Sequence, residues 1–438
     1  MLKKFIHYVS LNVMAMVSIS FLIFVDTFFI ARAMGADGLT SLNLAIPIYS
    51  VVNGVGHMLG VGGGARFATL RAAGNKEDAQ RVFTIAFLAG MLFSLLFMGL
   101  GIWVSEDIAT LMGATGHIHS MTAAYIQTVL TLAPALVLSN TLASFIRNDG
   151  TPRVAMISTV ILSVSNIVLD YIFIFPLGMG MFGAALATMI GSSLGLIYLL
   201  VHWWLGRSNL RFLTSERPLR GFGRIALTGM PSLIGDLSSA IVLTVFNLLI
   251  LDLEGNVGVA VFGIVANLSL VVLAVFNGVG QGMQPLVSAA YGKHDEKGQK
   301  QVLKYAHVTV LGLALLTYGT AFLFTDYLTA IFNSGGDPLL SAMARYGVRI
   351  YFTGFIFVGI TIITIIYLSI THAPKAAFIL SLLRGGIIIV PMVLLLAPLL
   401  GITGVWLSYP LAEFLVMVAA LIVYRKYNIL ISPRFPIP

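Results

Sequence analysis

The sequence predicts an all-α polytopic membrane protein whose twelve transmembrane helices form two six-helix, pseudo-symmetric lobes. Three observations lead to this fold class. The first is composition: 58% of the 438 residues are hydrophobic and only 10% are charged, whereas soluble domains carry about 25% charged residues. The second is a series of twelve long apolar segments, and the third is a match between the two halves of the chain. So few charges cannot cover a surface that faces water everywhere.

A membrane-spanning helix needs about 20 mainly apolar residues, and twelve segments meet that requirement. We expect helices over residues 8–33, 43–66, 82–104, 120–146, 152–176, 181–205, 223–251, 257–282, 302–325, 341–371, 375–399 and 402–424. The alternating pattern of membrane β-strands does not compete with this assignment. The lipid bilayer is therefore an expected partner of the chain.

The distribution of charge predicts how the chain is oriented. Its net charge is +8, but the basic side chains gather in loops on the side of the N-terminus, and the opposite loops are mainly acidic. This positive-inside asymmetry predicts a multi-pass protein of the cytoplasmic (inner) membrane with both termini in the cytoplasm. It argues against nucleic acid as a partner. The chain has no Cys, which excludes disulfides and thiolate metal sites.

The two halves of the chain form an internal repeat. When the sequence is shifted by 218 residues, "GVGGGA" at 60–65 aligns with "GVGQGM" at 278–283, and similar polar loops follow both. We therefore divide the chain into an N-terminal lobe, 1–205, a cytoplasmic linker, 206–222, and a C-terminal lobe, 223–438. Six helices per repeat give parallel repeats, a transporter architecture with sites near the repeat interface and alternating access. The aligned glycines predict close helix packing.

Two buried carboxylates in the first half lie at the same predicted depth. A charge at mid-membrane costs about 2.5–3.5 kcal/mol on insertion scales. Asp26 and Asp170 each lie about 18 residues, or roughly 27 Å, along a helix that runs outward. Asn166 precedes Asp170 by four residues and shares its helix face. Thr188 lies roughly 10 Å below the outer end of the sixth helix, at a matching level.

These four oxygen-bearing side chains predict a site for a sodium ion or a proton, because all are hard ligands. Two adjacent carboxylates repel each other, and a bound ion relieves that repulsion and changes which helix arrangement is favoured. The alternative is that Asp26 and Asp170 are unrelated and that each faces an aqueous vestibule.

Four further polar residues in the predicted spans are candidates for a secondary relay or a substrate site. Asp236 and Glu413 lie near mid-depth in the second half, where they could form a second relay or bind cationic substrates. Alternatively, Asp236 pairs with Arg384 and has a structural role. His57 is a lone histidine in the second span, where packing or a hydrogen bond is favoured over a proton site.

Enzyme signals are weak. "GVGGGA" lacks the G-K-[ST] ending of a phosphate-binding loop, and no soluble segment is long enough to be an ATP-binding domain. No catalytic residues and no cofactor are expected. Uphill transport by this chain would therefore use an ion gradient, with Na+ or H+ as the coupling ion.

Several segments resemble the multidrug and toxic compound extrusion (MATE) family. They are "VDTFFIARAMGADGLTSLNLAIPI", "RNDGTPRVAM", "NIVLDYIFIFPLGMGMFGAALAT" and "GITGVWLSYPLAEF". The resemblance covers essentially the whole chain and is strongest to the bacterial DinF-like and MepA-like branch. It implies two six-helix lobes arranged as a V around a central cavity. It also implies export of organic, often cationic, compounds in exchange for sodium ions or protons.

The resemblance also implies a location for the coupling ion. In some prokaryotic members a first-lobe site uses an Asp on helix one, an Asn and an Asp four apart on helix five, and a Thr on helix six. Asp26, Asn166, Asp170 and Thr188 match those positions. Another branch uses an acidic pair on helices seven and ten. Here helix ten has no carboxylate and Asp236 is a loose match on helix seven, so the first lobe is favoured.

The function expected from the sequence is therefore a cation-coupled antiporter that exports organic, cationic or amphipathic, drug-like compounds by alternating access. Small organic molecules are its expected substrates and a monomer its expected working state. The alternative within transport is a flippase for a lipid-linked precursor. Such flippases carry more basic residues facing the cavity, whereas Arg384 is the clear intramembrane cation here. A channel and a membrane-embedded enzyme are further alternatives from other classes.

Overall fold

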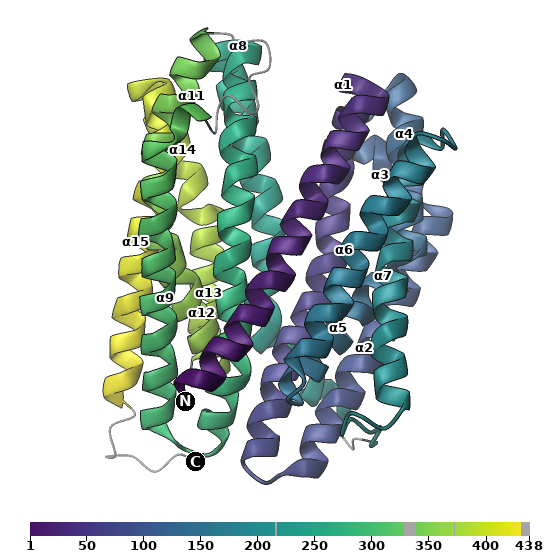
Figure 1. Cartoon of the computed structure of the whole chain (residues 1–438), viewed down its shortest axis with the longest axis vertical. Helices are drawn as coiled ribbons and strands as arrows, with labels where there is room; N and C mark the ends of the chain where they lie inside the picture. Colours follow the sequence, from purple (N-terminus) through teal and green to yellow (C-terminus); the bar gives the residue numbers. More distant parts are fainter. Residues whose placement is uncertain (215–216, 328–337, 372, 431–438) are drawn as a thin grey trace.

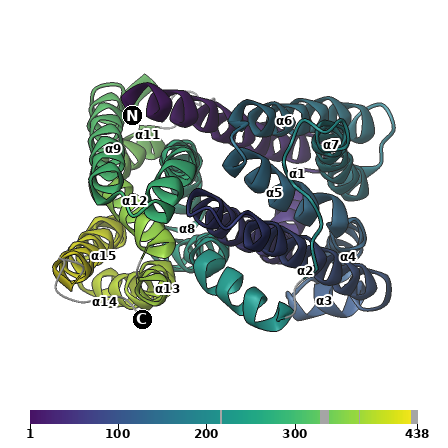
Figure 2. The same cartoon turned by 90° about the horizontal axis from the view of Figure 1, so that it is seen from below.

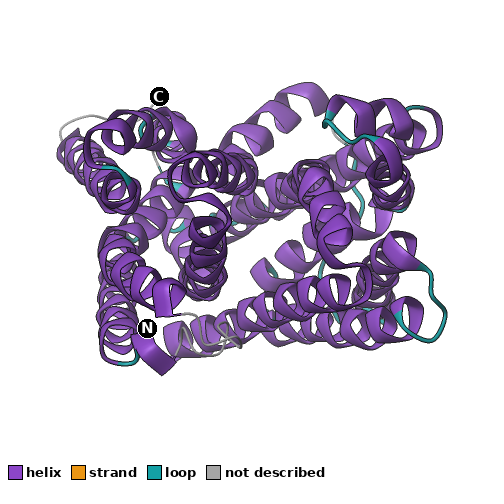
Figure 3. Cartoon of the chain, turned by 90° about the horizontal axis from the view of Figure 1, so that it is seen from above, coloured by secondary structure: helices purple, strands orange, loops and turns teal. Residues whose placement is uncertain are grey.

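The computed structural model describes residues 1–214, 217–327, 338–371 and 373–430, and every element in these ranges is helical (Figures 1 and 3). The first half contains α1 (Leu2–Ala72), α2 (Lys76–Trp103), α3 (Ser105–Leu111), α4 (Gly116–Thr131), α5 (Ala133–Asn148), α6 (Pro152–Ile174) and α7 (Gly180–Trp204). The second half contains α8 (Pro218–Gly292), α9 (Glu296–Leu323), α11 (Pro338–Tyr351), the 3-10 helix η1 (Phe352–Gly354), α12 (Phe355–Ile370), α13 (Pro374–Leu382), the π-helix η2 (Leu383–Ile387), α14 (Ile389–Leu400) and α15 (Ile402–Leu430).

Eleven helical segments are long and apolar enough to cross a membrane, and α4 with α5 forms a twelfth span if that bent pair is counted as one. The predicted fold class is confirmed. The helix expected over 120–146 is bent by 49° between α4 and α5. Pro134 lies at the start of α5 and has no N–H to continue the hydrogen-bond ladder of α4. Hydropathy misses this bend because proline does not interrupt the apolar run.

A single glycine kink stands where a loop was expected between the first and second predicted spans, and another stands between the seventh and eighth. α1 contains both of the first two predicted spans, and α8 contains the seventh and eighth. Gly35 in α1 and Gly255 in α8 each have a φ of 62°, in the left-handed region that glycine adopts without penalty. The helix before Gly35 has no other break. The same kink therefore recurs at matching places in the two halves, which is a structural sign of the repeat.

The starts of later helices repeat as well. Pro152 begins α6, and Pro374 begins α13 222 residues later. Proline suits the first turn of a helix, because its missing N–H would have no partner there. These starts correspond to the matched segments "TPRVAM" and "APKAAF" in the sequence.

The helices form two bundles that lie closest together at the end where α1 begins and α15 ends and farther apart at the other end (Figures 1 and 2). One large hydrophobic core lies mostly in the first half, around Phe83 and Phe145, and another lies mostly in the second half, around Phe276 and Trp406. The lobe boundaries 1–205, 206–222 and 223–438 stay a prediction. Residues 215–216 of the linker and 431–438 of the tail lie outside the described residues.

Glycines allow the backbones of the two halves to touch near the end that holds the termini. A Cβ on Gly229 of α8 would lie 1.9 Å from the carbonyl oxygen of Met58 in α1, and one on Gly292 would lie 2.1 Å from that of Thr69. Side chains at these positions would force the helices apart. We call this set of contacts the glycine seam, formed by Gly62, Gly229, Gly278, Gly282 and Gly292.

Candidate functional site

The structure brings together the first-lobe residues that the sequence placed at one depth. Asn166 and Asp170 lie on α6, and Thr188 faces them from α7. The Asn166 carboxamide bridges its two neighbours. Its Nδ2 donates to Asp170 Oδ2 at 3.0 Å, and its Oδ1 accepts from Thr188 Oγ1 at 3.0 Å. The amide therefore orients one carboxylate oxygen of Asp170 and leaves the other oxygen for a different partner.

Asp26 completes this cluster from α1. Its carboxyl group lies close enough to that of Asp170 for the two side chains to interact. Asn166 and Asp170 are fully buried. The Oδ1 atoms of both aspartates are buried and have no hydrogen-bond partner among the described residues. Two carboxylate oxygens that lack partners, beside an amide and a hydroxyl, form an oxygen-only donor set that suits a small hard cation or a proton.

Two tyrosines that the sequence analysis did not single out extend this cluster. Tyr125 on α4 interacts electrostatically with Asp26 and Asp170, and Tyr49 on α1 interacts with Asp26 and Asp236. A buried tyrosine hydroxyl usually needs a polar partner, and that was the signal available in the sequence. Tyr49 therefore interacts both with a first-lobe carboxylate and with Asp236, which belongs to a second polar site.

This second site joins the two halves of the chain. His57 Nδ1 on α1 lies 2.9 Å from Asp236 Oδ2 on α8, and the two side chains are each 28% exposed. Asn53 Nδ2 donates to the same Asp236 oxygen at 3.3 Å, and Asn140 Nδ2 donates to Asn53 Oδ1 at 2.9 Å. His57 makes the hydrogen bond that the sequence favoured, and its partner lies in the other half.

The expected alternative pairing of Asp236 with Arg384 is wrong. Arg384 Nε lies 3.0 and 3.2 Å from the two carboxylate oxygens of Glu413. Glu413 is 5% exposed and Arg384 is 22% exposed, and the Tyr409 hydroxyl also contacts the guanidinium. The physical reason is adjacency, because α13, η2 and α15 pack together, and a buried carboxylate needs the nearest available cation.

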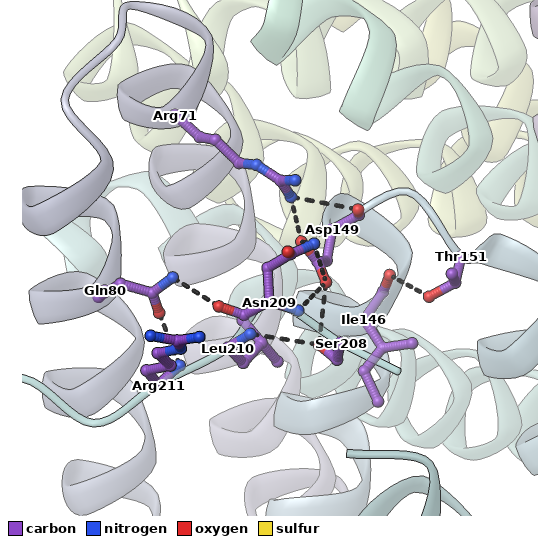
Figure 4. Close-up of polar contacts among 9 residues, drawn as sticks. All are labelled: Arg71, Gln80, Ile146, Asp149, Thr151, Ser208, Asn209, Leu210 and Arg211. Carbon is purple, nitrogen blue, oxygen red and sulfur yellow. Dashed lines mark hydrogen bonds and ion pairs between the residues drawn. The ribbon is translucent and has the colours of Figure 1, made fainter. Parts of the chain in front are cut away.

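A third polar cluster fastens the linker to the first half, on the side of the termini (Figure 4). The Asp149 side chain is 1% exposed and pairs with Arg71. It also accepts hydrogen bonds from Ser208 Oγ at 2.9 Å and from the Asn209 backbone N–H at 2.8 Å. Gln80 continues the contact, since its side chain bonds the backbone of Asn209 and Arg211. Sequence reasoning counted Arg71 and Arg211 among the basic loop residues and did not single out the others.

Comparison with known proteins agrees with the fold and the arrangement of helices. The MatE family model matches residues 12–172 and 231–395. The multidrug export protein MepA of Staphylococcus saprophyticus is 26% identical over 401 residues, which cover 91% of this chain and 88% of that protein.

Solved structures show the same fold. A crystal structure of MATE in complex with MaL6 has a TM-score of 0.90 at 21% identity, covering 98% of this chain and 96% of that chain. An outward-facing multidrug resistance MATE family transporter has a TM-score of 0.87 at 20% identity, covering 97% and 95%. Because the family model matches most of the sequence in both halves, the chain belongs to the MatE family, the multidrug and toxic compound extrusion (MATE) transporters.

Proposed function

We propose that this transporter is an antiporter that exports organic, cationic or amphipathic, drug-like compounds in exchange for Na+ or H+ by alternating access. It acts in the cytoplasmic membrane as a monomer, with both termini in the cytoplasm and with no cofactor besides the coupling ion. The observation that carries the proposal is the Asp26–Asp170 pair, whose buried Oδ1 atoms have no hydrogen-bond partner in the part of the chain that the structure describes. Export of drug-like compounds is supported by the MepA relatives, which are named multidrug export proteins.

The coupling ion is proposed to bind between Asp26 and Asp170, with Asn166 and Thr188 fixing the geometry. Within the described residues, no Lys, Arg or His pairs with either aspartate. An incoming ion therefore supplies the positive charge that relieves their repulsion. Release of the ion restores that repulsion and favours a different packing of α1 against α6 and α7.

α1 provides a direct mechanical connection from the ion to the other lobe. Asp26 lies on the same unbroken helix as Val9 and Val13, and these two residues pack on Gly282 and Gly278 of α8. A change in how Asp26 docks on α6 therefore shifts a helix that also forms part of the glycine seam. An ion that binds one lobe arrangement better than the other shifts the population by its differential affinity.

The flippase alternative has less support. A flippase for an anionic lipid-linked precursor would present unpaired basic side chains to the cavity. Arg384 instead lies against the carboxylate of Glu413, so its charge is already compensated within its own lobe.

Export from proteoliposomes under an imposed ion gradient tests the proposal. Ethidium efflux would be measured with a sodium gradient alone and with a proton gradient alone. Wild type would be compared with Asp26→Asn, and Asp37→Asn serves as a matched control, because Asp37 is exposed just after the Gly35 kink of the same element. We expect one gradient to drive efflux in wild type and in the control. The gradient-driven efflux rate of Asp26→Asn should be at least tenfold lower than that of wild type.

Two results would contradict the proposal. Gradient-driven efflux at the wild-type rate in the Asp26→Asn variant would remove this residue from the coupling site. Ethidium movement that is independent of both gradients would exclude antiport.

A further inference from the structure

We propose that Asp236 binds the positive charge of the exported compound and that His57 displaces this compound when the lobes close on the cytoplasmic side. The inference rests on the proposed function and adds to it a residue for substrate recognition and a step for release. In its protonated form, His57 acts as a tethered competitor, an internal cation that occupies the carboxylate in the closed arrangement.

The position of the pair supports this role. His57 lies midway along the span Asp37–Ala72, and Asp236 lies midway along Pro218–Gly255. The seam contacts begin next to the pair, where Gly54 meets Leu233 and Gly229 meets the Met58 backbone. The pair therefore lies next to the segment where the backbones of the two halves touch. When that segment parts, a compound that enters between the halves from the cytoplasm reaches Asp236.

His57–Asp236 is also the one contact between a carboxylate and a basic side chain that the described residues make across the two halves, since the others lie within one half. Parting the glycine seam moves α1 away from α8, and the 2.9 Å contact between His57 Nδ1 and Asp236 Oδ2 cannot survive that movement. Opening toward the cytoplasm therefore leaves the Asp236 carboxylate without its cation. Closing returns His57 to the same oxygen.

The surroundings of Asp236 suit an organic cation. The carboxylate is partly exposed rather than sealed, with a side-chain exposure of 28%. Tyr49 lies close enough to interact electrostatically, and aromatic rings attract cations. Asn53 donates to the same Oδ2 that His57 contacts, so that oxygen has little room for another partner. An imidazolium and a bound organic cation carry the same charge and compete for the same atom.

Tethering makes this competition effective. A group held on the adjacent lobe competes at a local concentration in the millimolar range, as linked binding partners do. The exported compound stays bound to Asp236 while the lobes are apart and is displaced from it when they close. Release is thereby tied to closure of the cytoplasmic side.

Equilibrium binding of tetraphenylphosphonium to the purified full-length chain, with no ion gradient, tests this inference. Asp236→Asn should weaken binding at least tenfold. His57→Gln keeps a hydrogen-bond donor but removes the competing charge, and it should tighten binding several-fold. His57→Lys makes the charge permanent and should weaken binding at least tenfold. Asp252→Asn, the same substitution at an exposed site on the same element, should bind within twofold of wild type.

The opposite effects expected of the two His57 variants separate a charge competitor from a packing residue. Equal weakening by both variants, or wild-type affinity in His57→Gln, overturns the displacement role. Wild-type affinity in Asp236→Asn overturns the binding role. Because this assay contains no gradient, a failure of ion-driven efflux in proteoliposomes would refute antiport without changing the order of affinities expected here.

Discussion

The Arg384–Glu413 pair gives a quantitative test of how charges are held in the second lobe. In Arg384→Met the guanidinium that contacts both oxygens of Glu413 is lost, and the carboxylate remains at 5% exposure. Removing one partner of a buried ion pair costs about 3–5 kcal/mol. Uptake of a proton by Glu413 limits this cost, so we expect the lower end, about 3 kcal/mol.

Glu413→Gln should cost less than Arg384→Met. The glutamine oxygen can still accept from Arg384 Nε, and the guanidinium is 22% exposed, so we expect a loss of about 1–3 kcal/mol, the range for a weakened charged hydrogen bond. The double variant Arg384→Met/Glu413→Gln leaves no buried charge and should recover most of the stability lost in the arginine variant.

Thermal unfolding in detergent, monitored by the loss of the monodisperse species, measures these differences. A domain of about 150–250 residues, the size of one lobe, shifts its Tm by roughly 2–4 °C per kcal/mol. Arg384→Met should therefore melt about 6–12 °C below wild type. The double variant should melt between wild type and Arg384→Met. The reasoning is refuted if Arg384→Met melts within about 2 °C of wild type, or if the double variant melts no higher than Arg384→Met.

Three further predictions follow from the contacts described above. Saturating coupling ion, supplied as Na+ or as lowered pH, should raise the Tm of wild type by about 5–10 °C, because a ligand at 100 times its Kd adds about 2.7 kcal/mol, and Asp170→Asn should show no rise. Ser288 is buried in wild type, and Ser288→Cys gives the chain a single cysteine. Gly229→Ala should part the glycine seam and make this thiol reactive to maleimide; an unreactive thiol would contradict this. Asp149→Ala should release the linker and speed tryptic cleavage after Arg211 several-fold, and an unchanged digestion rate would show that the carboxylate does not hold it.

The fold could be predicted because the bilayer imposes strong constraints on sequence. Every backbone polar group in lipid must be satisfied within the protein, so long apolar runs read directly as helices. The joints between helices were less predictable. Gly35 and Gly255 look like loop residues, yet each turns the chain at a single residue with a φ of 62°, so that one helix follows the other without a loop. Length and hydropathy do not distinguish these two outcomes.

The first-lobe cluster could be predicted because depth follows from counting residues along a rigid helix, with a rise of about 1.5 Å per residue. Counting does not tell which face of one helix meets which face of another. The partner of Asp236 depends on that rotation, and lipid-facing and protein-facing positions are both apolar here. Pairing by depth alone therefore suggested Arg384, whereas packing placed His57 beside the carboxylate.

Matching positions of the repeat hold different contacts in the two lobes. At the offset of 222 residues that separates the starts of α6 and α13, Arg384 corresponds to Leu162 and Glu413 to Gly191. These two first-lobe positions also touch, because a Cβ on Gly191 would lie 2.8 Å from the carbonyl oxygen of Leu162. The same helix crossing therefore holds an apolar contact in the first lobe and an ion pair in the second.

This difference bears on where an exchangeable ion can bind. In the second lobe a carboxylate placed at that crossing has a resident cation, Arg384, which no change of conditions within the physiological range removes. In the first lobe Asp26 and Asp170 meet with no basic side chain paired to them within the described residues, so their charge must be balanced by something that arrives from solution. A carboxylate whose counter-ion is a side chain of the same protein has no need to bind Na+ or H+. A carboxylate pair without such a counter-ion does. The asymmetry between repeats therefore favours a single coupling site, in the first lobe, and it predicts that Arg384→Met would create a second ion-responsive carboxylate, detectable as a new dependence of Tm on pH that Arg384→Met/Glu413→Gln lacks.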